Sequence, residues 1–154
     1  MKKTKTFHAY YRSPLGWLRI EGAGSSLRSL DFVSKKDHGL STVLPAQIRR
    51  ELGQYFRGRR KRFSLRLKPS GTAFQKKVWK ALQSIAYGAK ASYSDIAARI
   101  GRRKSVRAVA GAIGRNRLAI LIPCHRVIGK NGSLTGYAHG LRKKAWLLRR
   151  EKGL

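Results

Sequence analysis

Apolar and polar residues alternate along three early segments of the chain, a period that predicts β-strands with one buried face. Turn-forming residues separate the segments, with 13–16 (Ser-Pro-Leu-Gly) after the first and 22–24 (Gly-Ala-Gly) after the second. Such short turns predict an antiparallel meander. A fourth alternating segment, 63–68, is expected to complete the sheet. The three early segments are 7–11, 17–21 and 27–33.

Elsewhere the apolar residues recur at helical spacing. Pro45 opens one expected helix, which ends near Gly58. Farther along, Thr72 with Gln75 and Ser92 with Asp95 have the spacing of capping boxes, so each pair predicts a helix start. The remaining helices are expected over 105–114 and 141–151.

A segment of turn-forming residues, Lys68-Pro69-Ser70-Gly71, separates the strand-rich part of the chain from the helix-rich part. We therefore predict an α/β protein with two subdomains. The amino-terminal α/β subdomain is expected over 1–70 and the carboxy-terminal subdomain over 71–154.

The only cysteine, Cys124, follows the apolar run 119–122 and Pro123, and it directly precedes His125 and Arg126. The run predicts a short buried strand. From this position alone, a packed structural cysteine and a reactive thiol are equally good interpretations. Basic neighbours favour the thiolate, which is the nucleophilic form, so Cys124 is a candidate nucleophile.

The two helices expected over 92–101 and 105–114 are joined by a tight basic turn, 102–104, as in a helix-turn-helix. The second helix would present Arg107 beside small residues that allow close approach to a DNA groove. A helical hairpin that only packs fits the segment equally well. The small residues are Ala108, Gly111 and Ala112.

The net charge of the chain favours the DNA-binding interpretation of this segment over the helical hairpin. The chain has 36 Lys and Arg against 6 Asp and Glu, a formal net charge of +30, which favours a polyanionic partner: nucleic acid first, and then an anionic membrane surface or an acidic protein. The excess is spread over both parts, so it does not locate the binding face: residues 1–71 hold 17 basic and 4 acidic groups, and residues 72–154 hold 19 and 2. The run 59–62 (Arg-Arg-Lys-Arg) is interpreted as a solvated loop.

The composition also indicates the cellular compartment of the protein. A single cysteine excludes an internal disulfide and a cysteine-based zinc site, and it is typical of a reducing compartment. The charged start of the chain is not followed by a continuous apolar segment, so we expect no secretion signal and no membrane span. We expect no metal.

These features together resemble the O6-alkylguanine-DNA alkyltransferases, or methylated-DNA–protein-cysteine methyltransferases, in their short bacterial form. The similarity runs from about Thr72 to Glu151, and its most specific part is Pro-Cys-His-Arg-Val at 123–127. The amino-terminal part is similar only in its turn at 13–16. The other matching segments are 74–79, Tyr93, 107–112, Asn116, 128–129, Gly132, 134–137 and 144–148.

The resemblance implies a ribonuclease-H-like α/β amino-terminal subdomain and a winged-helix-like carboxy-terminal subdomain with the helix-turn-helix. It implies direct-reversal DNA repair, in which a flipped O6-alkylguanine in double-stranded DNA, and possibly O4-alkylthymine, transfers its alkyl group irreversibly to Cys124. Each molecule would act once, as a monomer and without a cofactor. The expected location is the cytoplasm, on the nucleoid.

The resemblance also implies a role for each site residue. His125 would deprotonate Cys124 through a bridging water, and Glu151 would orient the histidine. Tyr93 would donate a proton toward the leaving guanine, and Asn116 would brace the cysteine turn. Without the resemblance, Glu151 would be interpreted as an exposed residue at a helix end.

Two further groups of residues follow from the resemblance, which places DNA entry in the minor groove and Arg107 in the space left by the flipped base. The expected DNA contacts are Arg107, Ser94, Ala108, Gly111 and Arg126. The expected base pocket is formed by Tyr137, Ala138 and Lys144.

The sequence departs from the family pattern at two positions. His139 stands where a glycine is usual, which predicts a tighter pocket rim or an altered substrate range. Ala86 replaces a usual proline, with little expected effect.

Two other functions fit less well. A sensor or helix-turn-helix regulator that binds alkylated DNA without repairing it would lack the nucleophile that Cys124 offers. A cysteine hydrolase would need an oxyanion-hole motif, and none accompanies the Cys-His pair.

Overall fold

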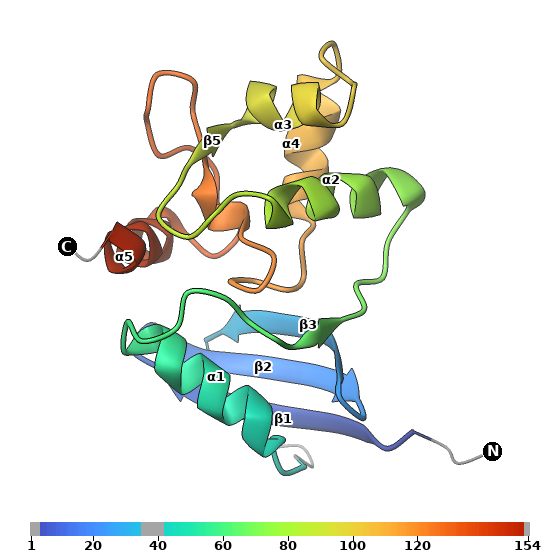
Figure 1. The fold of residues 1–154 in the computed structure, drawn as a ribbon, viewed down its shortest axis with the longest axis vertical. Helices are drawn as coiled ribbons and strands as arrows, with labels where there is room; N and C mark the ends of the chain where they lie inside the picture. The colour runs from blue at the N-terminus through green and yellow to red at the C-terminus, as the bar shows by residue number, and fades with distance from the viewer. Residues whose placement is uncertain (1–3, 35–41, 153–154) are drawn as a thin grey trace. The chain divides into compact units, whose positions relative to one another are not determined.

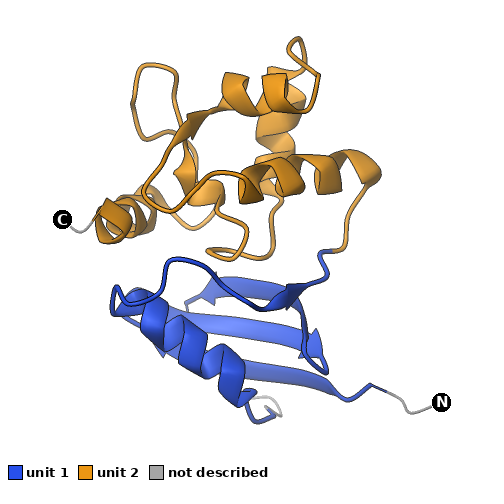
Figure 2. Ribbon diagram, in the orientation of Figure 1, with its two compact units in different colours: residues 1–69 blue, residues 70–154 orange. Residues whose placement is uncertain are grey.

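The structure, a computed structural model, describes residues 4–34 and 42–152, so the first three residues of the charged start lie outside it. The chain forms two compact units, residues 1–69 and 70–154 (Figure 2). No helix within the described ranges is both long and apolar enough to cross a membrane.

Unit 1 is built on the predicted meander. Strands β1 (Thr6–Ser13), β2 (Gly16–Ala23) and β3 (Ser26–Val33) pair antiparallel, with Ala9 opposite Ile20 and Ile20 opposite Leu30. Burial follows the period of two in β1 and β2, whereas β3 buries adjacent residues, Ser26 with Leu27 and Ser29 with Leu30, and its register with β2 shifts between Glu21 and Gly22. Helix α1 (Ala46–Phe56) lies across one face of the sheet (Figure 1), and Phe56 stacks on Tyr11 of β1.

The fourth strand is much shorter than the alternation at 63–68 predicts. Only Arg66–Leu67 forms β4, which pairs parallel to β3 at Ser26 and Leu27. The prediction is wrong for the first residues of the segment because the Ser64 N–H donates to the carboxylate of Glu51, at 2.8 Å, instead of to a neighbouring strand. The sheet order is β1-β2-β3-β4.

Unit 2 is mainly helical. Both predicted capping boxes are present: Thr72 caps α2 (Ala73–Gln83) with Gln75, and Ser92 caps α3 (Tyr93–Arg99) with Asp95. Helix α4 (Val106–Gly114) follows a tight turn in which Gly101 has φ +73°, a conformation that favours glycine. The helix-turn-helix prediction is thereby matched by α3 and α4. The last helix is α5 (Leu141–Lys152).

The core of unit 2 fixes α2 against α4. Val78 and Leu82 of α2 are fully buried, and so is Val109 of α4. Trp79 is buried too, and its indole N–H donates to the carbonyl of Ala112 at 2.8 Å. Ala112 is therefore a packing residue, and the prediction that it is exposed beside Arg107 is wrong.

The polypeptide between α4 and α5 carries a single 3-10 turn, η1 (Cys124–Arg126), followed by the short strand β6 (Val127–Ile128). Strand β6 pairs parallel to β5 (Ala91–Ser92), with Ala91 opposite Val127. This pair ties the start of α3 to the segment that carries Cys124. The elements of the candidate site are thus all held within unit 2.

Candidate active site

The apolar run before Cys124 is a buried turn and not the strand that its composition predicts. Residues 118–122 are all buried, but Ile120 has φ +72°, which a β-branched residue seldom adopts. The Ile122 N–H donates to the Leu118 carbonyl at 2.9 Å and thereby closes the turn. Backbone strain of this kind costs about 1 to 3 kcal/mol and is found where surrounding contacts over-determine the conformation.

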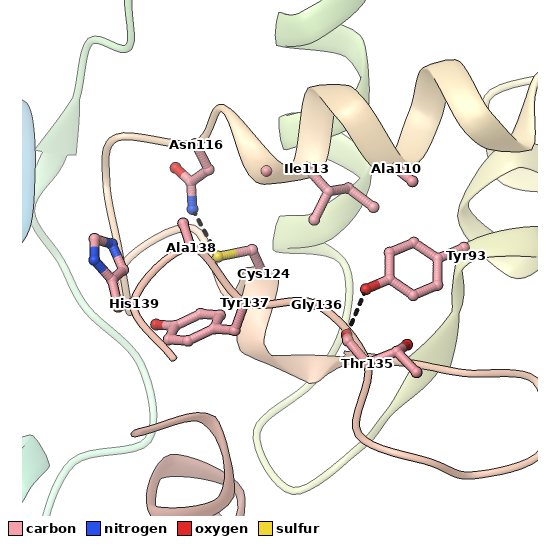
Figure 3. A pocket seen from close by; sticks show the side chains of 11 residues that line it. Tyr93, Ala110, Ile113, Asn116, Cys124, Thr135, Gly136, Tyr137, Ala138 and His139 are labelled. Atoms are coloured by element: carbon pink, nitrogen blue, oxygen red, sulfur yellow. Dashed lines mark hydrogen bonds between the residues drawn. The ribbon is translucent and has the colours of Figure 1, made fainter. Parts of the chain in front are cut away.

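Asn116 supplies those contacts. Its Oδ1 accepts from the Leu118 N–H at 2.8 Å, and its Nδ2 donates to the Ile122 carbonyl at 2.9 Å. The same Nδ2 lies 3.2 Å from Sγ of Cys124 (Figure 3). One buried amide therefore closes the turn at both ends and also contacts the thiol.

The Cys124 thiol is buried, with 9% of its surface exposed. Burial raises its pKa, and the hydrogen bond from Asn116 and the charge of Lys144 oppose that rise only in part. The basic residues next to Cys124 in the sequence thus do not keep its thiol ionised. A nucleophilic Cys124 needs a base that removes its proton.

His125 has the form of that base. Its Nε2 lies 2.7 Å from Oε1 of Glu151, and both side chains are buried. Burial lowers the pKa of His125 more than Glu151 raises it, so the imidazole is neutral at neutral pH. With Nε2–H donating to the carboxylate, Nδ1 carries the lone pair, and it makes no hydrogen bond to the described part of the chain. A buried unpaired imidazole nitrogen can accept a proton.

Glu151 is ionised although it is buried. Burial alone would raise its pKa, but hydrogen bonds and charge from His125 and Arg126 outweigh burial and lower the pKa to about 2. Glu151 is therefore not the exposed helix-end residue that sequence reasoning without the resemblance would give.

Arg126 is placed differently from the prediction. It was expected to contact DNA, yet its Nε and Nη2 each donate to Glu151 at 2.9 Å, and its Nη1 donates to the Ile85 carbonyl. The side chain is buried because these acceptors lie inside unit 2. Arg126 anchors the Glu151 carboxylate, and the prediction of a DNA contact is wrong.

A cavity of about 370 Å³ opens beside the thiol (Figure 3). Residues from α3, α4, the cysteine turn and the segment before α5 form its wall. The lining residues are Tyr93, Ala110, Ile113, Gly114, Asn116, Cys124, Thr135, Gly136, Tyr137, Ala138 and His139. A mainly apolar wall with a few polar groups is typical of a small-molecule or base pocket.

Several predicted residues lie on this wall. Tyr93 donates its hydroxyl proton to the Thr135 carbonyl at 2.8 Å, so its phenol is held at the cavity. Tyr137 is half-buried, and burial of its phenol raises the pKa well above 10. Ala138 lines the cavity beside it. The ring of His139 meets the edge of Tyr137 with 5.5 Å between centroids, so the unusual histidine does stand at the pocket.

Lys144 does not line the cavity, although it was expected to. Its side chain is fully buried, and its Nζ donates to the carbonyls of Thr135 and Gly136 at 2.9 and 3.0 Å. Burial lowers its pKa, opposed by the nearby Cys124. Lys144 therefore binds the backbone of Thr135 and Gly136, which line the cavity, and its positive charge favours the thiolate form of Cys124.

The other four predicted DNA-contacting positions are exposed on the two helices of the helix-turn-helix. Arg107, Ala108 and Gly111 are exposed on α4, and Ser94 is exposed near the start of α3. Two other residues of α4, Ala110 and Ile113, line the cavity. One helix therefore contributes to both the surface and the pocket.

Sequence reasoning missed some of the wall. The helical spacing predicts that Ala110 and Ile113 both face the core, but both line the cavity. Their i, i+3 spacing puts them on one side of α4, a signal that the helical period contains. Thr135 was included only as part of the resemblance.

Comparison with known proteins identifies the family. The family model described as the ribonuclease-like domain of 6-O-methylguanine DNA methyltransferase matches residues 6–69. The model described as the DNA binding domain of 6-O-methylguanine DNA methyltransferase matches residues 73–153. Together they account for both units.

Individual relatives agree. The methylated-DNA–protein-cysteine methyltransferase of Haemophilus influenzae is 42% identical, over 97% of this chain and 88% of that protein. The constitutive enzyme of Bacillus subtilis is 55% identical over 70% of this chain and 66% of its own. A crystal structure of Mycobacterium tuberculosis OGT in complex with DNA superposes with a TM-score of 0.87 at 41% identity, covering 95% of this chain and 92% of the other. This chain belongs to the 6-O-methylguanine DNA methyltransferase family, the methylated-DNA–protein-cysteine methyltransferases.

Proposed function

We propose that this protein repairs O6-alkylguanine in DNA by moving the alkyl group to Cys124 in a single, irreversible turnover. The observation that carries the proposal is a thiol at a cavity wall with a neutral, carboxylate-bound histidine as its sequence neighbour. Family membership supplies the substrate class, since the relatives are named for methylated DNA and a protein cysteine.

The proton is removed first. Nδ1 of His125 accepts it from the Cys124 thiol through a water, and Glu151 stabilises the imidazolium that forms. The hydrogen bond from Asn116 and the charge of Lys144 lower the free energy of the thiolate. Because burial favours the neutral thiol, formation of the thiolate depends on this proton transfer.

The thiolate then attacks the alkyl carbon. The sulfur–carbon bond forms as the bond between that carbon and guanine oxygen 6 breaks, and the electron pair passes to the base. Tyr93 turns its hydroxyl from Thr135 to the base and donates a proton. The proton held on His125 then returns through water to the Tyr93 phenolate, so that the proton gained by guanine balances the one lost by the thiol, and the thioether on Cys124 has no route back.

Recognition of the base uses the cavity and α4. Tyr137 and Ala138 form one wall for a flipped guanine, opposite the α4 residues. On the exposed face of α4, Arg107 enters the stack while Ala108 and Gly111 allow close approach to the minor groove, and Ser94 contacts the backbone. The partner is double-stranded DNA, the protein acts as a monomer without a cofactor, and it works in the cytoplasm on the nucleoid.

Mass spectrometry tests the proposal directly. The protein is incubated with a duplex that holds one O6-methylguanine, and the masses of the intact protein and of the peptide that contains Cys124 are measured. We expect one methyl group for each protein molecule, located on Cys124, and none in Cys124→Ala. Tight binding to the lesion duplex with an unmodified thiol would overturn repair and leave a damage sensor.

A further inference from the structure

A dense group of positive charges lies in unit 1, whereas the helix-turn-helix belongs to unit 2. Residues 46–62 hold seven basic residues and one acidic residue. Six of the basic side chains are exposed, and they follow the outward side of α1 into the loop after it. We define the basic cluster as Arg49, Arg50, Arg57, Arg59, Lys61 and Arg62.

The loop of this cluster is held in place by the one acidic residue. Glu51 is fully buried, and its carboxylate accepts from the N–H and the hydroxyl of Ser64, both at 2.8 Å, and from Nε2 of Gln47 at 2.9 Å. Burial would raise the pKa of Glu51, but these hydrogen bonds and Arg60 lower it. A charged carboxylate thus fixes the end of the loop to α1.

Arg60 is the one basic residue of the loop that turns inward. Its Nη1 lies 3.2 Å from Oε1 of Glu51 and donates to the Arg62 carbonyl at 2.8 Å. Its Nε donates to Oε1 of Gln54 at 2.8 Å. The run 59–62 is therefore an ordered loop and not only a solvated run of charge, and its other three cations are exposed.

The stretch 46–62 itself supplies no exposed acid that would neutralise this charge. Glu51 is the only acid between residues 46 and 62, and it is buried under Arg60. Glu21, another acid of unit 1, lies on β2 beside Arg19 and His8. Like charges held together on a folded loop repel each other, and a polyanion relieves that repulsion.

We propose that the basic cluster is a second DNA-binding surface, which contacts phosphates of duplex DNA without reading sequence or lesion. It rests on the proposed function only in taking DNA as the polyanion. Arg and Lys on a fixed loop release counterions when they meet phosphates, so this surface adds salt-dependent affinity to that of the helix-turn-helix.

The salt dependence of binding to an unmodified duplex tests the inference. The variant Arg59→Gln/Lys61→Gln/Arg62→Gln keeps Arg60 and Glu51, and it is compared with a matched control, Lys5→Gln/Arg28→Gln/Lys68→Gln. Both remove three exposed charges from unit 1. From about 50 to 200 mM salt, we expect the log–log slope to fall by about 2 to 3 in the cluster variant and to stay near wild type in the control.

Equal slopes in the two triple variants would overturn the inference, because total charge and not the cluster would then set affinity. A cluster variant that binds duplex like the control but loses binding to poly-glutamate would also overturn it, in favour of an acidic protein partner.

A second measurement separates binding from folding and from repair. Free O6-benzylguanine carries no phosphate, so both triple variants should transfer its benzyl group to Cys124 at the wild-type rate. Loss of this transfer in the cluster variant alone would make the cluster part of the fold and overturn the inference. If no protein alkylates Cys124, either from free O6-benzylguanine or from a duplex that holds O6-methylguanine, but the cluster variant shows the reduced slope, the proposed function fails and this inference stands.

Discussion

Arg126 and Glu151 form a buried bidentate ion pair, in which Nε of Arg126 lies 2.9 Å from Oε2 of Glu151 and Nη2 of Arg126 lies 2.9 Å from Oε1. The planar guanidinium matches both carboxylate oxygens and leaves Oε1 also in contact with His125. The orientation of the His125 imidazole therefore depends on Arg126, which is not among the residues that line the cavity.

Replacing Arg126 should destabilise the protein strongly. Arg126→Met leaves Glu151 buried with His125 alone, and we expect the free energy of unfolding to fall by about 3 to 5 kcal/mol. Arg126→Lys should recover only part of the lost free energy of unfolding, because an ammonium group cannot donate to both carboxylate oxygens of Glu151 with the planar geometry of a guanidinium. Denaturant unfolding measures the loss. Arg149→Met, at an exposed position of α5, is the control; equal losses in the two variants would contradict the structural role of Arg126.

Acid should unfold the protein partly through Glu151. Its pKa is about 2 in the folded protein against an ordinary value of 4.5, so the unfolded chain binds more protons between these values. The stabilisation is complete above about pH 5 and is lost as the pH falls toward 2. We expect the melting temperature of Glu151→Gln to be lower at neutral pH but to fall less steeply below about pH 5 than that of the wild type.

Thermal unfolding followed by circular dichroism across this pH range measures the effect. Glu21→Gln removes a carboxylate that is 44% exposed and should follow the wild-type curve. Parallel curves for the wild type and Glu151→Gln would show that Glu151 is not the acid-sensitive group.

Removing the Asn116 amide should affect both the turn and the thiol. Asn116→Ala leaves the Leu118 N–H without its partner and removes one of the two donors to the Ile122 carbonyl, which keeps the Cys124 N–H, a loss of about 1 to 3 kcal/mol in stability. It also removes the donor to Sγ that lowers the pKa of Cys124, so the thiol should ionise at higher pH. The rate of iodoacetamide alkylation against pH reports this shift. Asn131→Ala, in an exposed turn, should leave the profile unchanged.

The parts of the fold that rest on local interactions are predictable from sequence. The capping boxes at Thr72 and Ser92 join residues three apart, so the sequence pattern contains both partners. The meander follows from a period of two and short turns. The specific motif at 123–127 likewise predicted the family, which the comparisons confirm.

What sequence did not show depends on contacts between distant residues. Arg126 is 25 residues from Glu151, so a basic residue beside the thiol was taken for a DNA contact. The apolar run 118–122 predicts burial, but only the amide of Asn116 makes a turn with Ile120 at φ +72° preferable to a strand. In the same way Glu51 takes the N–H of Ser64 and shortens β4. Buried polar groups, and not the hydrophobic pattern, decided these differences.

His139 should restrict the size of the alkyl group. Its ring packs edge-on against Tyr137 at 5.5 Å and lines the cavity beside Ala138, where the family usually has glycine. His139→Gly removes a ring from the rim, which gives a large alkyl group more room while a methyl group gains nothing. We expect the ratio of benzyl to methyl transfer from duplex DNA to rise by about tenfold.

Single-turnover rates for duplexes with O6-benzylguanine and O6-methylguanine give the ratio directly. His139→Ala should lie between glycine and the wild type, since its methyl group fills part of the space and avoids the added backbone freedom of glycine. His8→Gly, on β1 of unit 1, is the control: it removes a histidine outside the cavity and should leave the ratio unchanged. An unchanged ratio in both His139 variants would mean that Tyr137 and the α4 wall, and not the rim, limit what the pocket accepts.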